Sequence, residues 1–479
     1  MVELEHQQQL QSFPAPLYPS SSTSPGSVAM AWLGRNGENL RRVLRDLTIK
    51  GQQMPRSRKA ATALLVGLLA TLYYGRSKDE LQVHTQRTEM TEAIMALLSL
   101  DESSAFKSTW ATHNGHIATL HGYLRPQPPC LPCTQEIVHT DDGGHFALEW
   151  YSERVGASAV TAANTRKVSM TALREDLRTR PIVLLLHGVN DSGQHSYMRH
   201  LAHVVCTKKG WRAVCMTYRG CGTLSLTSPQ CYDAANTADI ALAVDTIRAR
   251  FPAASLFLVG FSLGANIMVK YLGEEGPRAV GRIFGAVAIS NPWAFHPQIE
   301  SLHYTNKPGS FHRISAWVYS ILVAHEYKKY VRRHKNQLRE RLKELQRPLE
   351  SMHTLRELDE NVTVPLNGWR DLNHYMTAAS SSEYIEGVAI PLLGLNALDD
   401  PLVSREALEH TVAKASKNPN VILVNTTRGG HIGWGGQART ASWAENLTVE
   451  FIHAAAKVQG LLLDREEPEK EIERPHARL

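Results

Sequence analysis

Short, continuous runs of apolar residues recur along the middle of the chain, and they constrain the fold more than any other feature. Residues 181–186 read PIVLLL, without the polar alternation of a strand that faces water on one side. Such runs are typical of strands that are buried on both faces of a sheet. Five further runs have the same character: residues 212–217, 256–259, 285–289, 390–395 and 421–424.

Segments with helical spacing of their apolar residues lie between these runs. Residues 197–208, 237–251 and 264–272 are of this type. Strands that alternate with helices predict a parallel sheet, because each crossover between parallel strands places a helix on a face of the sheet. We therefore predict an α/β fold over residues 110–460, with a mostly parallel central sheet covered by helices.

One interval between predicted strands is much longer than the others, and it runs over residues 291–386. We expect a helical cap insertion over the C-terminal edge of the sheet. Within it, residues 328–347 carry nine Lys or Arg and only two Glu at helical spacing. Two interpretations of this basic helix remain open: an ordinary solvated face, or a surface suited to anionic lipid headgroups.

The ends of the chain differ from the middle in composition. Residues 1–59 begin with a Gln run and a Pro/Ser-rich stretch and become basic, and residues 464–479 are charged and interrupted by proline. Both segments are predicted to be disordered. The net charge of +6 over 479 residues is too small to indicate a nucleic-acid partner, which requires charge concentrated on one face.

A stretch of 16 residues without a charge, residues 60–75, is a candidate membrane anchor. As a helix it spans about 24 Å, less than the roughly 30 Å of a hydrocarbon core, so a buried or interfacial helix remains an alternative. Eight Lys or Arg lie within 25 residues upstream and three downstream, which predicts a cytoplasmic N-terminus. We expect a single-pass protein of the endoplasmic reticulum or another endomembrane.

The six cysteines are too few for a disulfide framework in a chain of this length. Cys130 and Cys133 have the spacing of a metal or redox pair, but no second pair follows them. Ordinary thiols are the simpler interpretation, so we expect no metal and no organic cofactor.

The strongest chemical signal is the pentapeptide GFSLG at residues 260–264. It follows a predicted buried strand and opens a predicted helix, which is the setting of a nucleophile elbow. Small glycines allow the tight turn that holds the Ser262 hydroxyl clear of the backbone. Because a serine hydroxyl is a weak nucleophile, it needs a base and a group that orients the base.

Two later strand ends supply these partners. They follow Ser262 in the chain order Ser, Asp, His that accompanies a nucleophile elbow. Residues 390–395 lead into Asp399 and Asp400, and residues 421–424 lead into His431, which follows two glycines. We prefer Asp400, because it opens an Asp-x-x-Val turn, and Asp399 is the alternative. The predicted triad is therefore Ser262, Asp400 and His431.

The same logic predicts donors for the oxyanion of an acyl-transfer intermediate. The backbone N–H of Leu263, directly after the nucleophile, is one donor. The other is expected in the loop after the strand at 181–186, where we choose the backbone N–H of Val189. His187 in this loop is interpreted as structural.

Taken together, these motifs resemble the YheT-like branch of the α/β-hydrolases, which includes membrane-anchored α/β-hydrolase-domain lipases of animals, medium-chain ester synthases of yeast and embryogenesis-associated plant proteins. The motifs that carry the resemblance are Asn-Gly-His at 114–116, Asp-Gly-Gly at 142–144, Tyr-Arg-Gly-Cys-Gly at 218–222, the elbow, and Gly-Gly-His-Ile-Gly at 429–433. The resemblance implies an esterase or lipase on acylglycerols, phospholipids or medium-chain esters. It also implies the triad Ser262, Asp400 and His431.

Three functions remain open from the sequence. The first is a serine hydrolase of lipid esters. The second is an alcohol O-acyltransferase, since hydrolysis and acyl transfer share one acyl-enzyme and differ only in the nucleophile that attacks it. The third is a catalytically inactive receptor or scaffold at a membrane, because a fold alone does not establish an activity.

Overall fold

The computed structural model describes residues 79–101, 105–109, 112–151, 178–296, 311–435 and 441–461. Two compact units divide the chain, residues 1–69 and 70–479, and all described residues belong to the second. The predicted N-terminal segment, the candidate anchor at 60–75 and the tail at 464–479 lie outside the described residues. In the described ranges, we find no helix with the length and apolar character that a membrane crossing requires.

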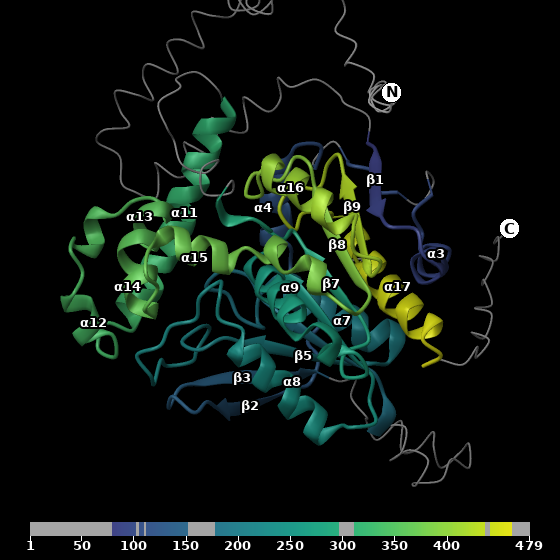
Figure 1. Ribbon diagram of the computed structural model, residues 1–479, viewed down its shortest axis with the longest axis horizontal. Coiled ribbons are helices and arrows are strands. Elements are labelled where there is room, and N and C mark those ends of the chain that lie inside the picture. Colours follow the sequence, from purple (N-terminus) through teal and green to yellow (C-terminus); the bar gives the residue numbers. More distant parts are fainter. Residues whose placement is uncertain are drawn as a thin grey trace, which may run out of the picture. The chain divides into compact units, whose positions relative to one another are not determined.

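A sheet of nine strands forms the centre of the described unit (Figure 1). Its order is β1-β9-β8-β7-β6-β4-β5-β3-β2. The strands β4 to β9 pair in parallel, whereas β1 joins one edge and β2 and β3 join the other in antiparallel fashion. The predicted mostly parallel sheet is confirmed. The strands are β1 (Leu81–Thr85), β2 (Cys133–His139), β3 (His145–Tyr151), β4 (Ile182–Leu186), β5 (Arg212–Thr217), β6 (Leu256–Phe261), β7 (Ala286–Ile289), β8 (Leu392–Ala397) and β9 (Val421–Thr426).

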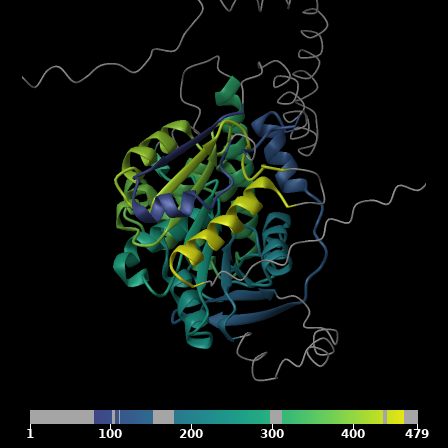
Figure 2. The same ribbon diagram turned by 90° about the vertical axis from the view of Figure 1, so that its right-hand side faces the viewer.

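Helices cover both faces of this sheet (Figures 1 and 2). Side chains of a strand point alternately to its two faces, so Ile182, Leu184 and Leu186 of β4 join the apolar cluster on one face and Val183 and Leu185 the cluster on the other. Each such buried side chain stabilises the fold by about 1.5–3 kcal/mol. The first face carries α8 (Ala238–Arg250), α9 (Leu263–Glu275) and α16 (Arg405–Ala415), and the second carries α3 (Glu89–Met95), α7 (Ser196–Lys209) and α17 (Trp443–Val458).

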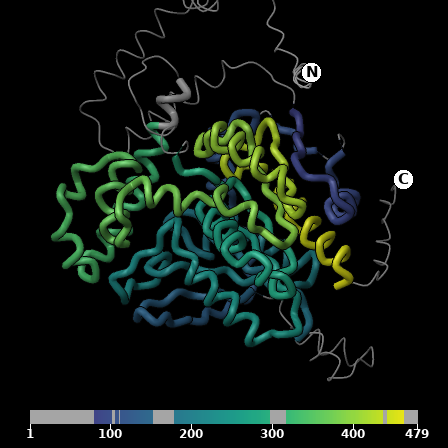
Figure 3. The backbone as a smooth tube through the Cα atoms, viewed as in Figure 1, coloured from purple at the N-terminus to yellow at the C-terminus, as the bar shows by residue number. Residues whose placement is uncertain are grey.

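Several helices lie between β7 and β8 along the chain, drawn in green in Figure 3. They occupy the interval in which a cap is predicted. The longest, α11, contacts α13, and α15 contacts α9 of the sheet layer. The cap helices are α11 (Phe311–Arg333), α12 (Arg339–Lys343), α13 (Leu355–Leu358), α14 (Val364–Asn367) and α15 (Leu372–Ala379).

The basic stretch at 328–347 is not the single helix that its spacing predicts. The helix α11 ends at Arg333, and α12 begins only at Arg339. The reason is that the intervening turn buries two side chains: Leu338 is fully buried, and His334 lies 2.7 Å from the carbonyl oxygen of Gly220 through Nε2. The stretch is therefore not a uniformly solvated face.

Asp359 in the cap makes the free energy of unfolding depend on pH. Its buried carboxylate accepts a hydrogen bond from Thr363 Oγ1 at 2.9 Å, and burial raises its pKa to about 7. Below about pH 4 this group is neutral in both the folded and the unfolded state. Between about pH 4 and 7 only the folded state retains the proton, so the free energy of unfolding falls by about 4 kcal/mol as the pH rises.

We therefore expect Asp359→Asn to raise the melting temperature at pH 8 and to change it little at pH 4. Thermal unfolding followed by circular dichroism at both values measures this difference. Glu360→Gln is the control, because Glu360 is the exposed residue next to Asp359 in the same helical segment. An equal shift at both pH values would contradict the assigned cause.

Candidate active site

The turn between β6 and α9 holds Ser262 in a strained conformation. Its backbone has φ 53° and ψ −120°, a region that costs a residue with a side chain about 1–3 kcal/mol. Gly264, two residues further on, packs against β4, and a Cβ at this position would lie 2.5 Å from the carbonyl oxygens of Leu186 and His187. Only glycine fits there. The turn therefore lifts Ser262 above the carboxyl edge of the sheet.

Three predicted residues meet at this edge. His431 Nε2 lies 2.9 Å from Ser262 Oγ, and His431 Nδ1 lies 2.8 Å from Asp400 Oδ2. Because a carboxylate accepts hydrogen bonds, Nδ1 carries the proton and Nε2 is left to accept from the serine hydroxyl. The Asp400 side chain is fully buried, and its Oδ1 accepts from the N–H groups of Leu402 and Val403. This arrangement can move a proton from Ser262 to His431 and stabilise the resulting imidazolium.

The neighbouring carboxylate, Asp399, points to a different partner. Its Oδ1 accepts a hydrogen bond from the N–H of Gly430 at 2.8 Å. Burial raises the pKa of Asp399 to about 6, although the bond to Gly430 acts in the opposite direction. The structure therefore pairs Asp400, not Asp399, with His431.

The helix α4 (Gly115–Leu124) supports the loop that carries His431. Thr119 Oγ1 accepts a hydrogen bond from the N–H of His431 at 2.8 Å and donates to the carbonyl of Gly115. The start of α4 also lies directly against the loop after β8, since a Cβ on Gly115 would overlap the carbonyl oxygen of Asp399. On the other side, Ser290 Oγ accepts from the N–H of Ile432 at 3.0 Å. Two hydroxyls from distant parts of the chain thus fix His431 and its neighbour.

The two predicted oxyanion donors flank Ser262. Leu263 is the first residue of α9, so its N–H has no acceptor within the helix. The loop after β4 passes beside the nucleophile, because a Cβ on Gly188 would lie 3.5 Å from Ser262 Cβ. Within the described ranges no group accepts a hydrogen bond from the N–H of Val189, the next residue. Both N–H groups are therefore candidate donors to an oxyanion that forms at Ser262.

The residues on either side of Val189 are held by tyrosines. Gly188 N–H donates to Tyr197 Oη at 3.0 Å, and that hydroxyl donates to the buried Asp191 at 2.6 Å. Asn190 N–H donates to Tyr232 Oη at 2.9 Å. The conformation of the donor loop is thus fixed by side chains that touch no reacting atom.

These supporting residues were not predicted from the sequence. Thr119 and His431 are 312 residues apart, and nothing in the local pattern marks Thr119, Ser290, Tyr197 or Tyr232 as part of a site. Among the supporting residues, only Asp191 was marked by its position in the sequence, because it lies in the loop that follows the strand β4.

Tyr197→Phe is expected to lower kcat about tenfold and to leave KM within about twofold. The substitution removes the hydroxyl that holds Gly188, so the neighbouring Val189 N–H loses its alignment with the oxyanion. Loss of a whole oxyanion donor lowers kcat about 10²- to 10³-fold, and misalignment of a donor lowers kcat less. Steady-state kinetics on a short-chain ester test this, with Tyr271→Phe, on the far part of α9, as the control. A rise in KM at constant kcat would instead indicate a role in ground-state binding.

His187 is placed as a structural residue of the same loop. Its side chain is fully buried, Nε2 accepts from the N–H of Tyr218 at 3.2 Å, and Nδ1 donates to the carbonyl of Gly188 at 2.7 Å. Burial lowers the pKa of His187 to about 4. It is therefore neutral near pH 7 and ties β5 to the donor loop.

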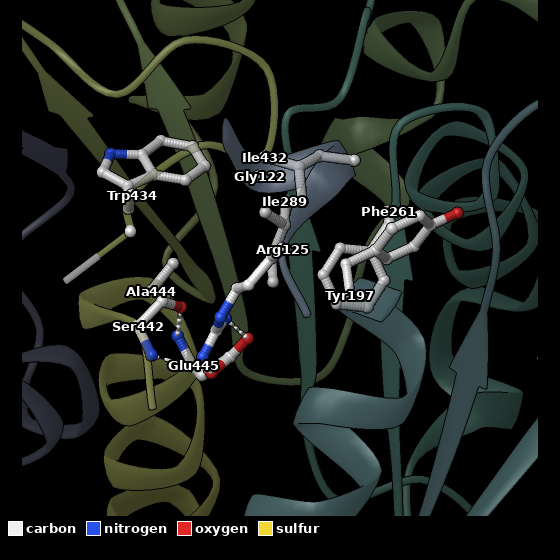
Figure 4. A pocket seen from close by; sticks show the side chains of 11 residues that line it. Gly122, Arg125, Tyr197, Phe261, Ile289, Ile432, Trp434, Ser442, Ala444 and Glu445 are labelled. Carbon is white, nitrogen blue, oxygen red and sulfur yellow. Dashed lines mark hydrogen bonds and ion pairs between the residues drawn. The ribbon is translucent and has the colours of Figure 1, made fainter. Parts of the chain in front are cut away.

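A small cavity of about 20 Å³ lies behind the His431 loop (Figure 4). Apolar side chains such as Phe261, Ile432 and Trp434 line it, and the buried ion pair between Arg125 and Glu445, 2.6 Å apart, closes one side. A volume of this size holds about one water molecule. The cavity is therefore part of the packing behind the site and too small for an acyl chain.

The cysteine pair belongs to no metal-binding cluster among the described residues. Cys130 and Cys133 are exposed free thiols. In the part of the chain that the structure describes, no group of three or more His, Cys, Asp or Glu side chains could hold a metal ion.

Comparison with known proteins agrees with this architecture. A family model described as "alpha/beta hydrolase fold" matches residues 181–433, which is more than half of the chain. The chain belongs to the α/β-hydrolase fold family. The predicted α/β-hydrolase superfamily and fold class are thereby confirmed.

Two similar proteins carry the names of enzymes that act on lipids. Monoacylglycerol lipase of Saccharomyces cerevisiae is 32% identical over 293 residues, which cover 60% of this chain and 63% of the relative. The match thus spans less than two thirds of the yeast enzyme. Phospholipase ABHD3 of Mus musculus is 28% identical over 351 residues, which cover 73% of this chain and 78% of the relative.

Solved structures are similar at lower identity. A soluble variant of monoglyceride lipase from Saccharomyces cerevisiae, in complex with a substrate analog, matches with 13% identity and a TM-score of 0.39 over 69% of this chain and 98% of that chain. The Pyrobaculum calidifontis esterase matches with 14% identity and a TM-score of 0.40 over 71% and 88%.

Proposed function

We propose that this α/β-hydrolase is a serine hydrolase that cleaves carboxylic esters of lipids. The observation that carries the proposal is the hydrogen-bonded relay from Ser262 through His431 to Asp400, with distances of 2.9 and 2.8 Å. Such a relay on a strained turn is the arrangement that activates a serine hydroxyl. An intact relay also argues against the inactive receptor or scaffold.

In the proposed first half-reaction, Ser262 Oγ attacks the ester carbonyl while His431 Nε2 takes its proton. Negative charge then develops on the carbonyl oxygen, and the N–H groups of Leu263 and Val189 donate to it. Each such donor contributes about 3–4 kcal/mol to lowering the barrier. His431 returns the proton to the leaving alcohol, and the acyl group stays on Ser262.

In the second half-reaction, His431 removes a proton from water as the water attacks the acyl-enzyme. The bond between Ser262 Oγ and the acyl carbon then breaks, His431 returns the proton to Oγ, and the fatty acid is released. Asp400 holds the imidazole in the tautomer that both steps need and stabilises its cation. An alcohol that replaced water in this step would give a new ester, which is the acyltransferase alternative.

The proposed substrates are acylglycerols, phospholipids or medium-chain fatty acid esters. Support comes from the names of the relatives, a monoacylglycerol lipase in yeast and a phospholipase in mouse. A monoacylglycerol lipase of Danio rerio, 28% identical over 57% of this chain, has the same type of name.

The test is labelling of the purified protein with a fluorophosphonate probe, followed by product analysis with a medium-chain monoacylglycerol. We expect labelling of the wild type, none of Ser262→Ala, and free fatty acid as the product. The same assay with added ethanol separates the alternatives, since an acyltransferase forms ethyl ester in place of the acid. A folded wild type without labelling would refute the proposal and favour the scaffold.

We also propose that residues 60–75 anchor the protein in the endoplasmic reticulum or another endomembrane, with the hydrolase unit on the lumenal side. The uncharged stretch and the excess of basic residues before it support this topology. Asn361 and Asn446 are glycosylation sequons at half-buried positions. Glycosidase treatment of the cellular protein is expected to increase its gel mobility, and Asn361→Gln with Asn446→Gln should abolish that shift.

A further inference from the structure

A second pocket lies between the cap helix α11 and the loop that follows β4. Its volume is about 250 Å³. It begins at Asn190, the residue directly after the proposed oxyanion donor Val189, and adjacent Cα atoms are only about 3.8 Å apart. The lining residues are Asn190, Asp191, Ser192, His195, Gly222, Lys329, Tyr330 and Arg333.

Two cations of α11 face this pocket. Lys329 and Arg333 are four residues apart, so they lie on the same side of the helix. The Arg333 guanidinium donates to the carbonyls of Gly222 and Leu224, which holds it in place. The Lys329 ammonium contacts Glu326 at 2.6 Å, with both side chains about half exposed. Exposed pairs of this kind contribute little to stability, so Lys329 can exchange this partner for a ligand.

The one carboxylate in the lining is already satisfied. Asp191 accepts hydrogen bonds from Tyr123 and Tyr197 and contacts His195 at 2.8 Å, and its side chain is only 7% exposed. A ligand in the pocket would therefore meet the cations of α11 and little of the Asp191 charge. The remaining carboxylate beside the pocket is that of Glu326, which is half-exposed and does not line it. Ser192 Oγ accepts from the N–H of Gln194, so its own hydrogen is left to donate.

This combination favours a phosphate group. A fixed guanidinium, a half-exposed ammonium and a hydroxyl are donors that can bind phosphate oxygens. The volume is far above the roughly 10–15 Å³ that one water needs, so a phosphate with its ester carbon fits. In a glycerol phosphate ester, only the short glycerol backbone separates the phosphate from the acyl ester.

We infer that this pocket binds the phosphate of the substrate's headgroup while the acyl ester lies at Ser262. The inference rests on the proposed ester hydrolase activity and deepens it. It makes the protein selective for phosphate-bearing lipid esters over neutral acylglycerols, because Lys329 and Arg333 have no partner of opposite charge in a neutral substrate.

The test compares a monoacylglycerol with its 3-phosphate, both with the same acyl chain and in the same neutral detergent micelles. We expect Lys329→Met to lower kcat/KM for the phosphate about tenfold and to change kcat/KM for the neutral ester less than about twofold. Lys335→Met is the matched control, since Lys335 is exposed just after α11 and does not line the pocket. Equal changes for both esters, or none, would overturn the inference.

A second measurement needs no turnover and separates this inference from the proposed activity. Isothermal titration calorimetry of Ser262→Ala with glycerol 3-phosphate is expected to show binding that Lys329→Met removes and Lys335→Met retains. Absence of binding would overturn the phosphate site even if the wild type hydrolyses esters. Binding of inorganic phosphate alone, with no change in ester selectivity in Lys329→Met, would overturn the headgroup assignment in favour of a site for free phosphate.

Discussion

Ser262→Ala is expected to lower kcat for ester hydrolysis by about 10⁴- to 10⁶-fold. Without the hydroxyl no acyl-enzyme forms, and the two backbone N–H donors and the binding surface supply the remaining rate. The expected KM is close to that of the wild type, because the serine acts in the transition state and contributes little to ground-state binding. Initial rates of product formation with a chromogenic ester and with a monoacylglycerol measure the loss.

The strain at Ser262 gives this prediction an independent control. Ser262→Gly removes the same hydroxyl and also relieves the positive φ of 53°. It should raise the free energy of unfolding by about 1 kcal/mol, whereas Ser262→Ala should change it by no more than about that amount. Urea denaturation of the three proteins distinguishes loss of chemistry from loss of fold. Activity that persists in both variants would exclude Ser262 as the nucleophile.

The parallel part of the sheet could be predicted because burial leaves a clear pattern in the sequence. A strand covered on both faces has to be apolar throughout, and each of the six apolar runs overlaps one of the strands β4 to β9. The strands β1, β2 and β3 were not predicted. β1 and β2 are the edge strands, and β2 reads CTQEIVH with most of its side chains exposed. β3 lies next to β2 and is mostly buried, but His145 and Glu149 interrupt its apolar run HFALEWY.

The site was predictable to the extent that the fold places strand ends together. Ser262, Asp400 and His431 each follow a parallel strand, and the carboxyl ends of parallel strands meet at one edge. The choice between Asp399 and Asp400 is different, because both follow the same strand. It depends on which carboxylate faces His431, and a hydrogen bond to Gly430 turns Asp399 away.

Contacts between distant segments could not be predicted from the sequence. The pocket beside Val189 exists because α11 packs on the loop after β4, where Asn190 Nδ2 donates to the carbonyl of Glu326 at 3.0 Å. No spacing within either segment indicates this contact. The basic residues of the cap were noted as a group, and only packing separates the buried Lys328, bonded to the carbonyl of Met352, from Lys329 at the pocket.

The adjacent carboxylates give the second large prediction. Asp400→Asn is expected to lower kcat about 10⁴-fold. An amide in place of Asp400 Oδ2 can present N–H to His431 Nδ1, which would favour the tautomer with the proton on Nε2. That tautomer cannot accept the Ser262 proton. The imidazolium also loses the buried negative charge that stabilises it, so both half-reactions slow.

Asp399→Asn is the matched variant, because it makes the same chemical change one residue away. The side-chain oxygen of the introduced amide can still accept the hydrogen bond from Gly430 N–H, so kcat should remain within about tenfold of the wild type. The substitution also removes a buried carboxyl whose pKa of about 6 lies above the usual value. Its ionisation above about pH 6 opposes folding by about 3 kcal/mol, so Asp399→Asn should be more stable than the wild type at pH 8 and not at pH 4. Kinetics of the two variants side by side decide the assignment, and a larger loss in Asp399→Asn than in Asp400→Asn would transfer the catalytic role to Asp399.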